Sequence, residues 1–97
     1  MIKEAKEVAE LLKVLSNENR LLIVCYLMQE PMTVTQLNEK LDHLTQSALS
    51  QHLSLLKAHR ILESNKNGLN IIYNIRDERV VKLIDCIKVN FCPINLK

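Results

Sequence analysis

The fold of this 97-residue chain is decided by one stretch of sequence, Thr45-Gln-Ser-Ala-Leu-Ser-Gln-His-Leu-Ser-Leu-Leu-Lys57. Its leucines recur at the three- and four-residue spacing of a single helix face: Leu49, Leu53 and Leu56. The polar side chains between them fall on the other faces, and a threonine at the start is a favourable N-cap. The stretch therefore predicts an amphipathic helix that runs from its cap at Thr45 to about His59.

A shorter helix is expected just before it. Thr33-Val-Thr-Gln36 has the pattern of a capping box, and the helix that it starts should continue to about Leu41. Asp42-His-Leu-Thr45 then makes a tight connection between the two helices. Two short helices joined in this way are typical of a helix-turn-helix, in which the second helix enters the major groove of DNA by its N-terminal end.

A β-hairpin is expected directly after this helix pair. Ile61–Lys66 and Leu69–Ile75 flank Asn67-Gly68, which contains the only glycine in the chain. Asn-Gly is a strong hairpin signal, and we expect both residues to form the turn at positive φ. A hairpin in this place predicts a wing that lies along the neighbouring DNA backbone.

Helices complete the chain on both sides. Residues 3–15 have an amphipathic pattern, residues 17–29 are apolar nearly all round and belong at the centre, and Asp77 caps a last helix that ends before Pro93. The expected fold is mainly α with a β-hairpin: a winged helix-turn-helix of order ααααββα. Residues 1–97 then form a single DNA-binding and dimerisation domain.

Composition excludes several classes of protein. The chain is 47% apolar and 25% charged, which excludes intrinsic disorder, and its 3% aromatic content argues against a stacking platform for single strands. No apolar run approaches the ~20 residues of a membrane span, and no secretory signal is present, so we expect a cytoplasmic protein without membrane contact. Because it lacks a phosphate loop, a nucleophile–base pair and clustered carboxylates, we expect no enzyme activity, no catalytic residues and no cofactor.

Positive charge is concentrated in the middle third. Residues 43–76 carry four basic side chains against one acidic, whereas the whole chain has a net charge of only +2. Glutamine can pair with adenine, the serine hydroxyl can hydrogen-bond to more than one base, and the free backbone amides at a helix start favour phosphate. The candidate DNA-binding residues are therefore Thr33, Thr45, Gln46, Ser47, Ser50, Gln51, His52, Lys57, Lys66 and Asn67. The alternative for each is an ordinary solvated side chain, and His52 lies one turn from Leu49 and Leu56, where it could equally be a packing residue.

Three segments resemble the ArsR/SmtB winged-helix repressors: Leu15-Ser-Asn-Glu-Asn-Arg20-Leu-Leu-Ile, Ser47-Ala-Leu-Ser-Gln-His52-Leu-Ser-Leu-Leu-Lys57 and the second hairpin strand with Tyr73. The resemblance covers nearly the whole chain, and the second segment is its most specific part. It implies a recognition helix with a DNA-side role for His52. It also implies a homodimer, paired through the first and last helices, that binds an inverted repeat in double-stranded DNA.

The usual metal-sensing positions of that family are not filled. The third-helix site in its metal sensors carries Cys-x-Cys, and Thr33–Leu41 contains no cysteine. The last-helix site needs Asp, His and Glu, whereas residues 78–91 contain Asp85 and Cys86 but no histidine. We therefore expect no metal site at either position.

The three cysteines suggest a different signal. Cys25 in the second helix and Cys92 at the end of the last resemble the HlyU/BigR-like branch, which senses sulfur species and oxidants. The resemblance implies a repressor that reactive sulfur or oxidants release through a Cys25–Cys92 thiol switch. Alternatives stay open: Cys25 as a buried apolar residue, Cys86 as packing, or all three as thiolates of a soft-metal sensor. A ligand-independent regulator that displaces another DNA-bound protein, or a plain interaction module, is a further alternative.

Overall fold

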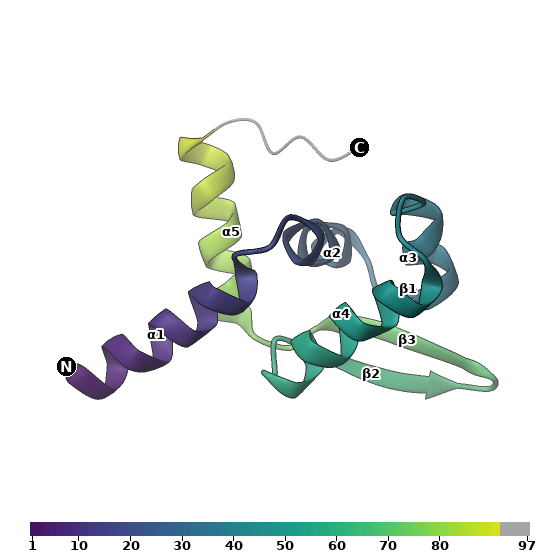
Figure 1. Ribbon diagram of the computed structural model, residues 1–97, viewed down its shortest axis with the longest axis horizontal. Coiled ribbons are helices and arrows are strands. Elements are labelled where there is room, and N and C mark those ends of the chain that lie inside the picture. The colour runs from purple at the N-terminus through teal and green to yellow at the C-terminus, as the bar shows by residue number, and fades with distance from the viewer. Residues whose placement is uncertain (92–97) are drawn as a thin grey trace.

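The computed structural model describes residues 1–91; the six residues that follow, Cys92 among them, lie outside the described part of the chain. Five helices and three strands are formed within it (Figure 1). In chain order they are α1 (Ile2–Leu15), α2 (Glu18–Gln29), β1 (Met32–Thr33), α3 (Val34–Lys40), α4 (Gln46–Ala58), β2 (Leu62–Asn67), β3 (Asn70–Ile75) and α5 (Glu78–Asn90). The winged helix-turn-helix that the sequence predicts is confirmed, with one strand more than expected.

Helix α2 lies at the centre of the molecule, between α5 and α3 (Figure 1). Four of its side chains are buried in the core, namely Ile23, Val24, Cys25 and Leu27. They join the leucine stripe of α4 and buried residues of α3, α5 and the sheet in a single cluster. The nearly all-round apolar pattern of residues 17–29 therefore predicted the central position correctly, because such a helix has no face to offer to water.

The sheet has three strands in the order β1-β3-β2, all antiparallel. The extra strand, β1, pairs Met32 with Tyr73 and Thr33 with Ile72. Sequence reasoning missed it because a two-residue strand has no periodicity of its own; its partner lies about forty residues further along the chain. Thr33 is also the N-cap of α3, so the sheet and the helix-turn-helix share this residue.

The hairpin turn differs by one residue from the expectation. Asn67 pairs with Asn70 at the end of the ladder, so the two turn residues are Gly68 and Leu69. Of these two turn residues, Gly68 alone has positive φ, at 65°. A two-residue turn with glycine at its first position and positive φ there alone matches type II′, which needs no asparagine in the turn.

Helices α1 and α5 project from one end of the molecule, and the wing tip lies at the other (Figure 1). The molecule measures 44 × 29 × 21 Å. Within α1 only Val14 and Leu15, at its C-terminal end, are buried, Leu11 packs partly against the core, and residues 2–10 are all exposed. None of the helices in residues 1–91 has the length and hydropathy needed to span a bilayer.

Candidate nucleic-acid interface and thiols

The two helices of the helix-turn-helix begin as the sequence predicts. Thr33 Oγ1 accepts from the Gln36 amide at 3.2 Å, and Gln36 Oε1 accepts from the Thr33 amide at 2.9 Å, which completes the capping box of α3. Thr45 Oγ1 accepts from the Ala48 amide at 3.0 Å and caps α4. These caps fix the start of each helix. The first amides of α4 have no intrahelical acceptor, which makes this end suitable for phosphate.

The turn between the helices is held by Asn38, a residue that sequence reasoning did not identify. Its Nδ2 donates to the carbonyls of Leu41 at 3.2 Å and Leu44 at 2.9 Å, so a side chain of α3 binds both sides of the turn. His43 is exposed, and its Nε2 lies 2.8 Å from Asn19 Oδ1 on α2. These contacts connect the turn to α3 on one side and to α2 on the other.

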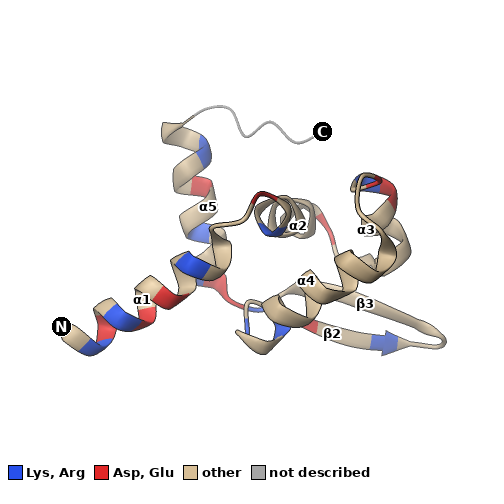
Figure 2. Ribbon diagram, in the orientation of Figure 1, with Lys and Arg blue, Asp and Glu red and all other residues tan. Residues whose placement is uncertain are grey.

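Helix α4 separates cleanly into two faces. Leu49, Leu53 and Leu56 are fully buried. The opposite face is exposed and largely polar, although Leu55 is 37% exposed beside it; its polar members are Gln46, Ser47, Ser50, Gln51, Ser54 and Lys57. Most of this helix is uncharged (Figure 2). An exposed face of amides and hydroxyls on the second helix of a helix-turn-helix is suited to contacts with base edges.

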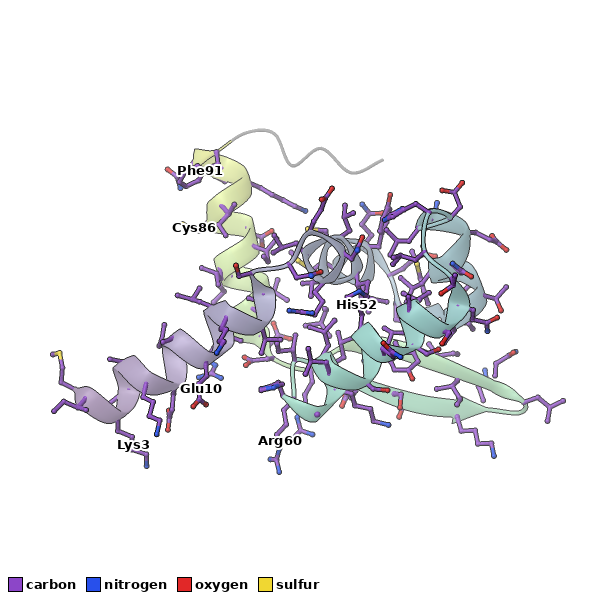
Figure 3. The ribbon with its side chains drawn as sticks, in the orientation of Figure 1. Lys3, Glu10, His52, Arg60, Cys86 and Phe91 are labelled. Carbon is purple, nitrogen blue, oxygen red and sulfur yellow. The ribbon has the colours of Figure 1, made fainter. Side chains whose placement is uncertain are left out.

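His52 lies at the edge between these faces, half-buried. Its Nδ1 is 3.5 Å from Nη1 of Arg20 on α2, and Figure 3 shows the ring between the two helices. Burial lowers the pKa of His52 below its ordinary value, and the nearby Arg20 charge lowers it further. The packing role that the sequence left open is thus present on one edge of the ring, while DNA contact by the other edge stays a prediction.

The remaining candidate residues lie around the sheet. Thr33 uses its hydroxyl oxygen as a helix cap, and Lys57 Nζ donates to Ser64 Oγ on β2 at 2.7 Å, which ties the end of α4 to the wing. Lys66 and Asn67 are exposed near the wing tip, where Lys66 carries the charge (Figure 2). The structure therefore brings the start of α4 and the wing to the surface, and DNA contact by these residues stays a prediction.

The cysteines differ in environment. Cys25 is 0% exposed although it borders a cavity of about 440 Å³ that Leu21 and Leu22 also line. Burial raises the pKa of the Cys25 thiol, and the positive charge of Lys88 on α5 partly counteracts this. Cys86 is exposed on α5, and Asn90 Nδ2 lies 3.5 Å from its sulfur. A buried thiol of raised pKa is a poor initial nucleophile, whereas Cys86 is accessible.

The other half of the expected redox pair, Cys92, lies outside the described residues, as does the Cys25–Cys92 separation. Over residues 1–91 the structure contains no group of three or more His, Cys, Asp or Glu side chains suited to a metal ion. The three-thiolate alternative includes Cys92 and therefore remains a prediction as well.

The N-terminal helix presents an apolar strip to solvent. Met1, Ala5, Val8, Ala9 and Leu12 line, with Glu4, an open hollow of about 610 Å³. Val8 and Leu12 remain 52% and 48% exposed. On α5, Val89 is 80% exposed and the adjoining Phe91 76% exposed. Apolar surface gathered on two projecting helices is typical of an interface with another protein surface.

Comparison with known proteins gives a consistent result. Residues 17–64 match the family model described as "Bacterial regulatory protein, arsR family". The chain is 33% identical over 95 residues to the transcriptional activator HlyU of Vibrio cholerae, an alignment that covers 98% of this chain and 87% of that protein. It is 36% identical over 92 residues to the biofilm growth-associated repressor of Agrobacterium fabrum, covering 95% and 78% of the two chains.

Solved structures agree with this. The fold matches the transcriptional repressor BigR from Xylella fastidiosa with a TM-score of 0.87 at 35% identity, over 95% of this chain and 93% of that one. A homodimeric winged helix-turn-helix DNA-binding domain from Mycobacterium bovis matches with a TM-score of 0.79 at 26% identity, over 91% and 81%. The similarity therefore extends over the whole described fold rather than over the helix pair alone.

Proposed function

The chain belongs to the arsR family of bacterial regulatory proteins, and from this premise we propose that it is a cytoplasmic, dimeric repressor that binds an inverted-repeat operator in double-stranded DNA. The family is one of DNA-binding transcriptional regulators and not of enzymes. The observation that carries the finer proposal is the exposed polar face of α4, which begins at a capped helix start and is flanked by the wing.

Each recognition helix has the chemistry for one half-site. Gln46, Ser47, Ser50 and Gln51 present amides and hydroxyls where base edges would lie. Thr45, Lys57, Lys66 and Asn67 surround them and are suited to phosphate contacts, which set register rather than sequence preference. His52 adds a ring nitrogen at the border of the two groups.

The projecting helices support the dimer. Residues 2–10 of α1 are all exposed in the single chain, and a lone 14-residue helix is only marginally stable in water. A second copy that covers the strip around Val8 and Leu12 removes that surface from water. The exposed Val89 and Phe91 extend the same surface onto α5. The Mycobacterium bovis domain, homodimeric and of the same fold, supports this reading.

The proposed signal is a persulfide or another oxidant that joins Cys25 to Cys92. With a persulfide RSSH, the two thiols lose two electrons and two protons and form one disulfide, while the sulfane sulfur is reduced to H₂S and RSH leaves. The influence of Lys88 on the Cys25 thiol supports this pairing, because α5 ends shortly after Lys88 and Cys92 follows its C-cap Phe91. Owing to its burial and raised pKa, Cys25 would be the second thiol to react.

Such a link would act on DNA binding through the dimer. It would tie α2, which contacts the helix-turn-helix, to α5 at the dimer surface, and so change the spacing of the two recognition helices. Half-sites lie about one DNA turn apart, ~34–36 Å, so a small change in spacing matters. Allosteric couplings of ~1–3 kcal/mol are typical and would weaken operator binding by roughly 5- to 150-fold.

The first experiment selects duplexes from a random-sequence library with the reduced protein. We expect an inverted repeat whose half-site centres lie about 10–10.5 base pairs apart. Recovery of single half-sites, or no enrichment, would contradict the proposal.

The second experiment measures the affinity for the selected operator by fluorescence anisotropy before and after treatment with a persulfide. The reduced wild-type protein should bind and the treated one should release. Cys92→Ser should abolish the response, while the matched control Cys86→Ser should keep it. A Cys92→Ser protein that still releases would exclude the pair as the switch. Dependence on all three cysteines, with a thiolate-to-metal absorption band on titration, would favour the soft-metal alternative.

A further inference from the structure

The first turn of α2 binds the helix-turn-helix at two successive residues. Asn19 lies 2.8 Å from His43 in the turn, and Arg20 reaches His52 on α4. Because α2 is the central helix, these contacts connect the recognition helix directly to the core. The second of them uses Arg20, a part-buried basic residue whose guanidinium needs hydrogen-bond acceptors there.

Arg20 has such an acceptor at the end of α1. Its Nε donates to the carbonyl of Val14 at 2.6 Å, and its Nη1 lies 3.5 Å from His52 Nδ1. One planar guanidinium thus joins the C-terminal end of the projecting helix to the recognition helix. Within residues 1–91, Arg20 is thus the residue whose side-chain contacts join α1, α2 and α4.

This contact specifies the state of the histidine ring. A guanidinium has only donors, so the 3.5 Å contact between Arg20 Nη1 and His52 Nδ1 is a hydrogen bond only when Nδ1 is the acceptor and carries no proton. The neutral ring then carries its proton on Nε2. Within residues 1–91 no partner binds Nε2, which leaves one N–H free at the border of the exposed face of α4.

We propose that Arg20 is a positioning residue for DNA binding, which holds His52 in the Nε2–H tautomer so that this N–H donates to a phosphate or base oxygen. The inference rests on the proposed function, because it needs α4 to bind DNA. It adds that Arg20, although basic, acts from behind the helix and contacts no phosphate. The same guanidinium keeps the recognition helix at a fixed position relative to the end of α1.

The tautomer is tested on the free protein with ¹⁵N-labelled histidine, by NMR spectra that correlate ring nitrogens with ring protons. The wild-type protein should show an unprotonated Nδ1 and a protonated Nε2 for His52. Arg20→Met, which keeps the aliphatic stem and removes every donor, should shift the ring to a mixture of tautomers. Lys13→Met removes one charge from the same end of α1 and is the matched control, without effect on the ring. A wild-type ring with the proton on Nδ1 would overturn the inference.

Operator binding gives the second readout. Arg20→Met should weaken it about tenfold, the loss of roughly one hydrogen bond at 1.4 kcal/mol per factor of ten. The slope of log K against log salt should stay unchanged, because a lost phosphate contact lowers the slope by about 0.9 and a lost positioning contact does not. A reduced slope would show that Arg20 touches DNA itself, and unchanged affinity would show that its contact does not matter; either overturns the inference.

Two substitutions at His52 keep the test decisive should Arg20→Met fail to fold. His52→Gln places an amide near the Nε2 position and should bind within about threefold of wild type, whereas His52→Asn places it near Nδ1 and should bind about tenfold more weakly. Equal binding by the two, or better binding by His52→Asn, contradicts the proposal. A wild-type protein that binds no operator would instead overturn the proposed function itself.

Discussion

Replacing Leu12 with alanine tests whether the strip on α1 is the dimer surface. Leu12 is 48% exposed in the single chain, and its neighbour on the strip, Val8, is 52% exposed. Alanine has the highest helix propensity, so the substitution should leave α1 itself intact. It removes most of the apolar side chain that a second copy would cover.

The expected size of the effect follows from burial. Full burial of a leucine side chain contributes about 1.5–3 kcal/mol, and roughly half of Leu12 remains to be covered, which gives about 0.75–1.5 kcal/mol per copy. A two-fold dimer contains the side chain twice, so Leu12→Ala should lose about 1.5–3 kcal/mol of dimerisation free energy. This corresponds to a dimer dissociation constant raised roughly 10- to 150-fold.

Sedimentation equilibrium over a range of concentrations measures this constant directly. Lys3→Ala is the matched control, because Lys3 lies on α1 away from the strip (Figure 3) and its loss should change dimerisation little. Circular dichroism of both variants checks that the helices are retained. Dimerisation of Leu12→Ala equal to that of the control, or a wild-type protein that stays monomeric at micromolar concentrations, would refute the assignment of the strip.

Three further outcomes are expected. Thr45→Ala should lower the free energy of unfolding by about 1 kcal/mol in urea titrations, while Thr45→Ser should keep it, because only the hydroxyl caps α4. The pKa of His52 in the folded protein lies below its ordinary value of about 6.5, so the unfolded chain takes up the proton first as pH falls. The free energy of unfolding should therefore decrease as pH drops from 6.5 through the folded pKa. His52→Gln should reduce this pH dependence, measured as the difference between unfolding experiments at pH 7.5 and 5.5. Cys86 should react with iodoacetamide on the order of tenfold or more faster than Cys25, which needs an opening of the core; equal rates by peptide mapping would contradict the burial of Cys25.

The features that the sequence predicted correctly are those set by neighbouring residues. Thr33, Thr45 and Asp77 cap helices because the acceptor lies two or three positions from the amide it binds. The leucine stripe of α4 is likewise a property of one helix. Each of these depends on local spacing, which is visible without knowledge of the rest of the chain.

The features that sequence reasoning missed depend on pairs far apart in the chain. Arg20 meets His52 across 32 positions, and Met32 of β1 pairs with Tyr73 of β3. In neither pair does the type of one residue indicate its partner. The turn lies one residue later than predicted, at Gly68-Leu69, for the same reason: the cross-strand hydrogen-bond ladder rather than the local dipeptide sets where the strands end.

The short strand β1 has a consequence for how the protein would recognise its operator. Thr33 pairs with the inner wing strand and also caps α3, so the wing and the helix-turn-helix form one rigid unit. A rearrangement at the dimer surface would then rotate the whole unit rather than bend the wing away from α4. The operator should accordingly be sensitive to phasing: one inserted base pair between the half-sites turns one of them by about 35° around the duplex axis, and a rigid unit has no joint with which to follow it.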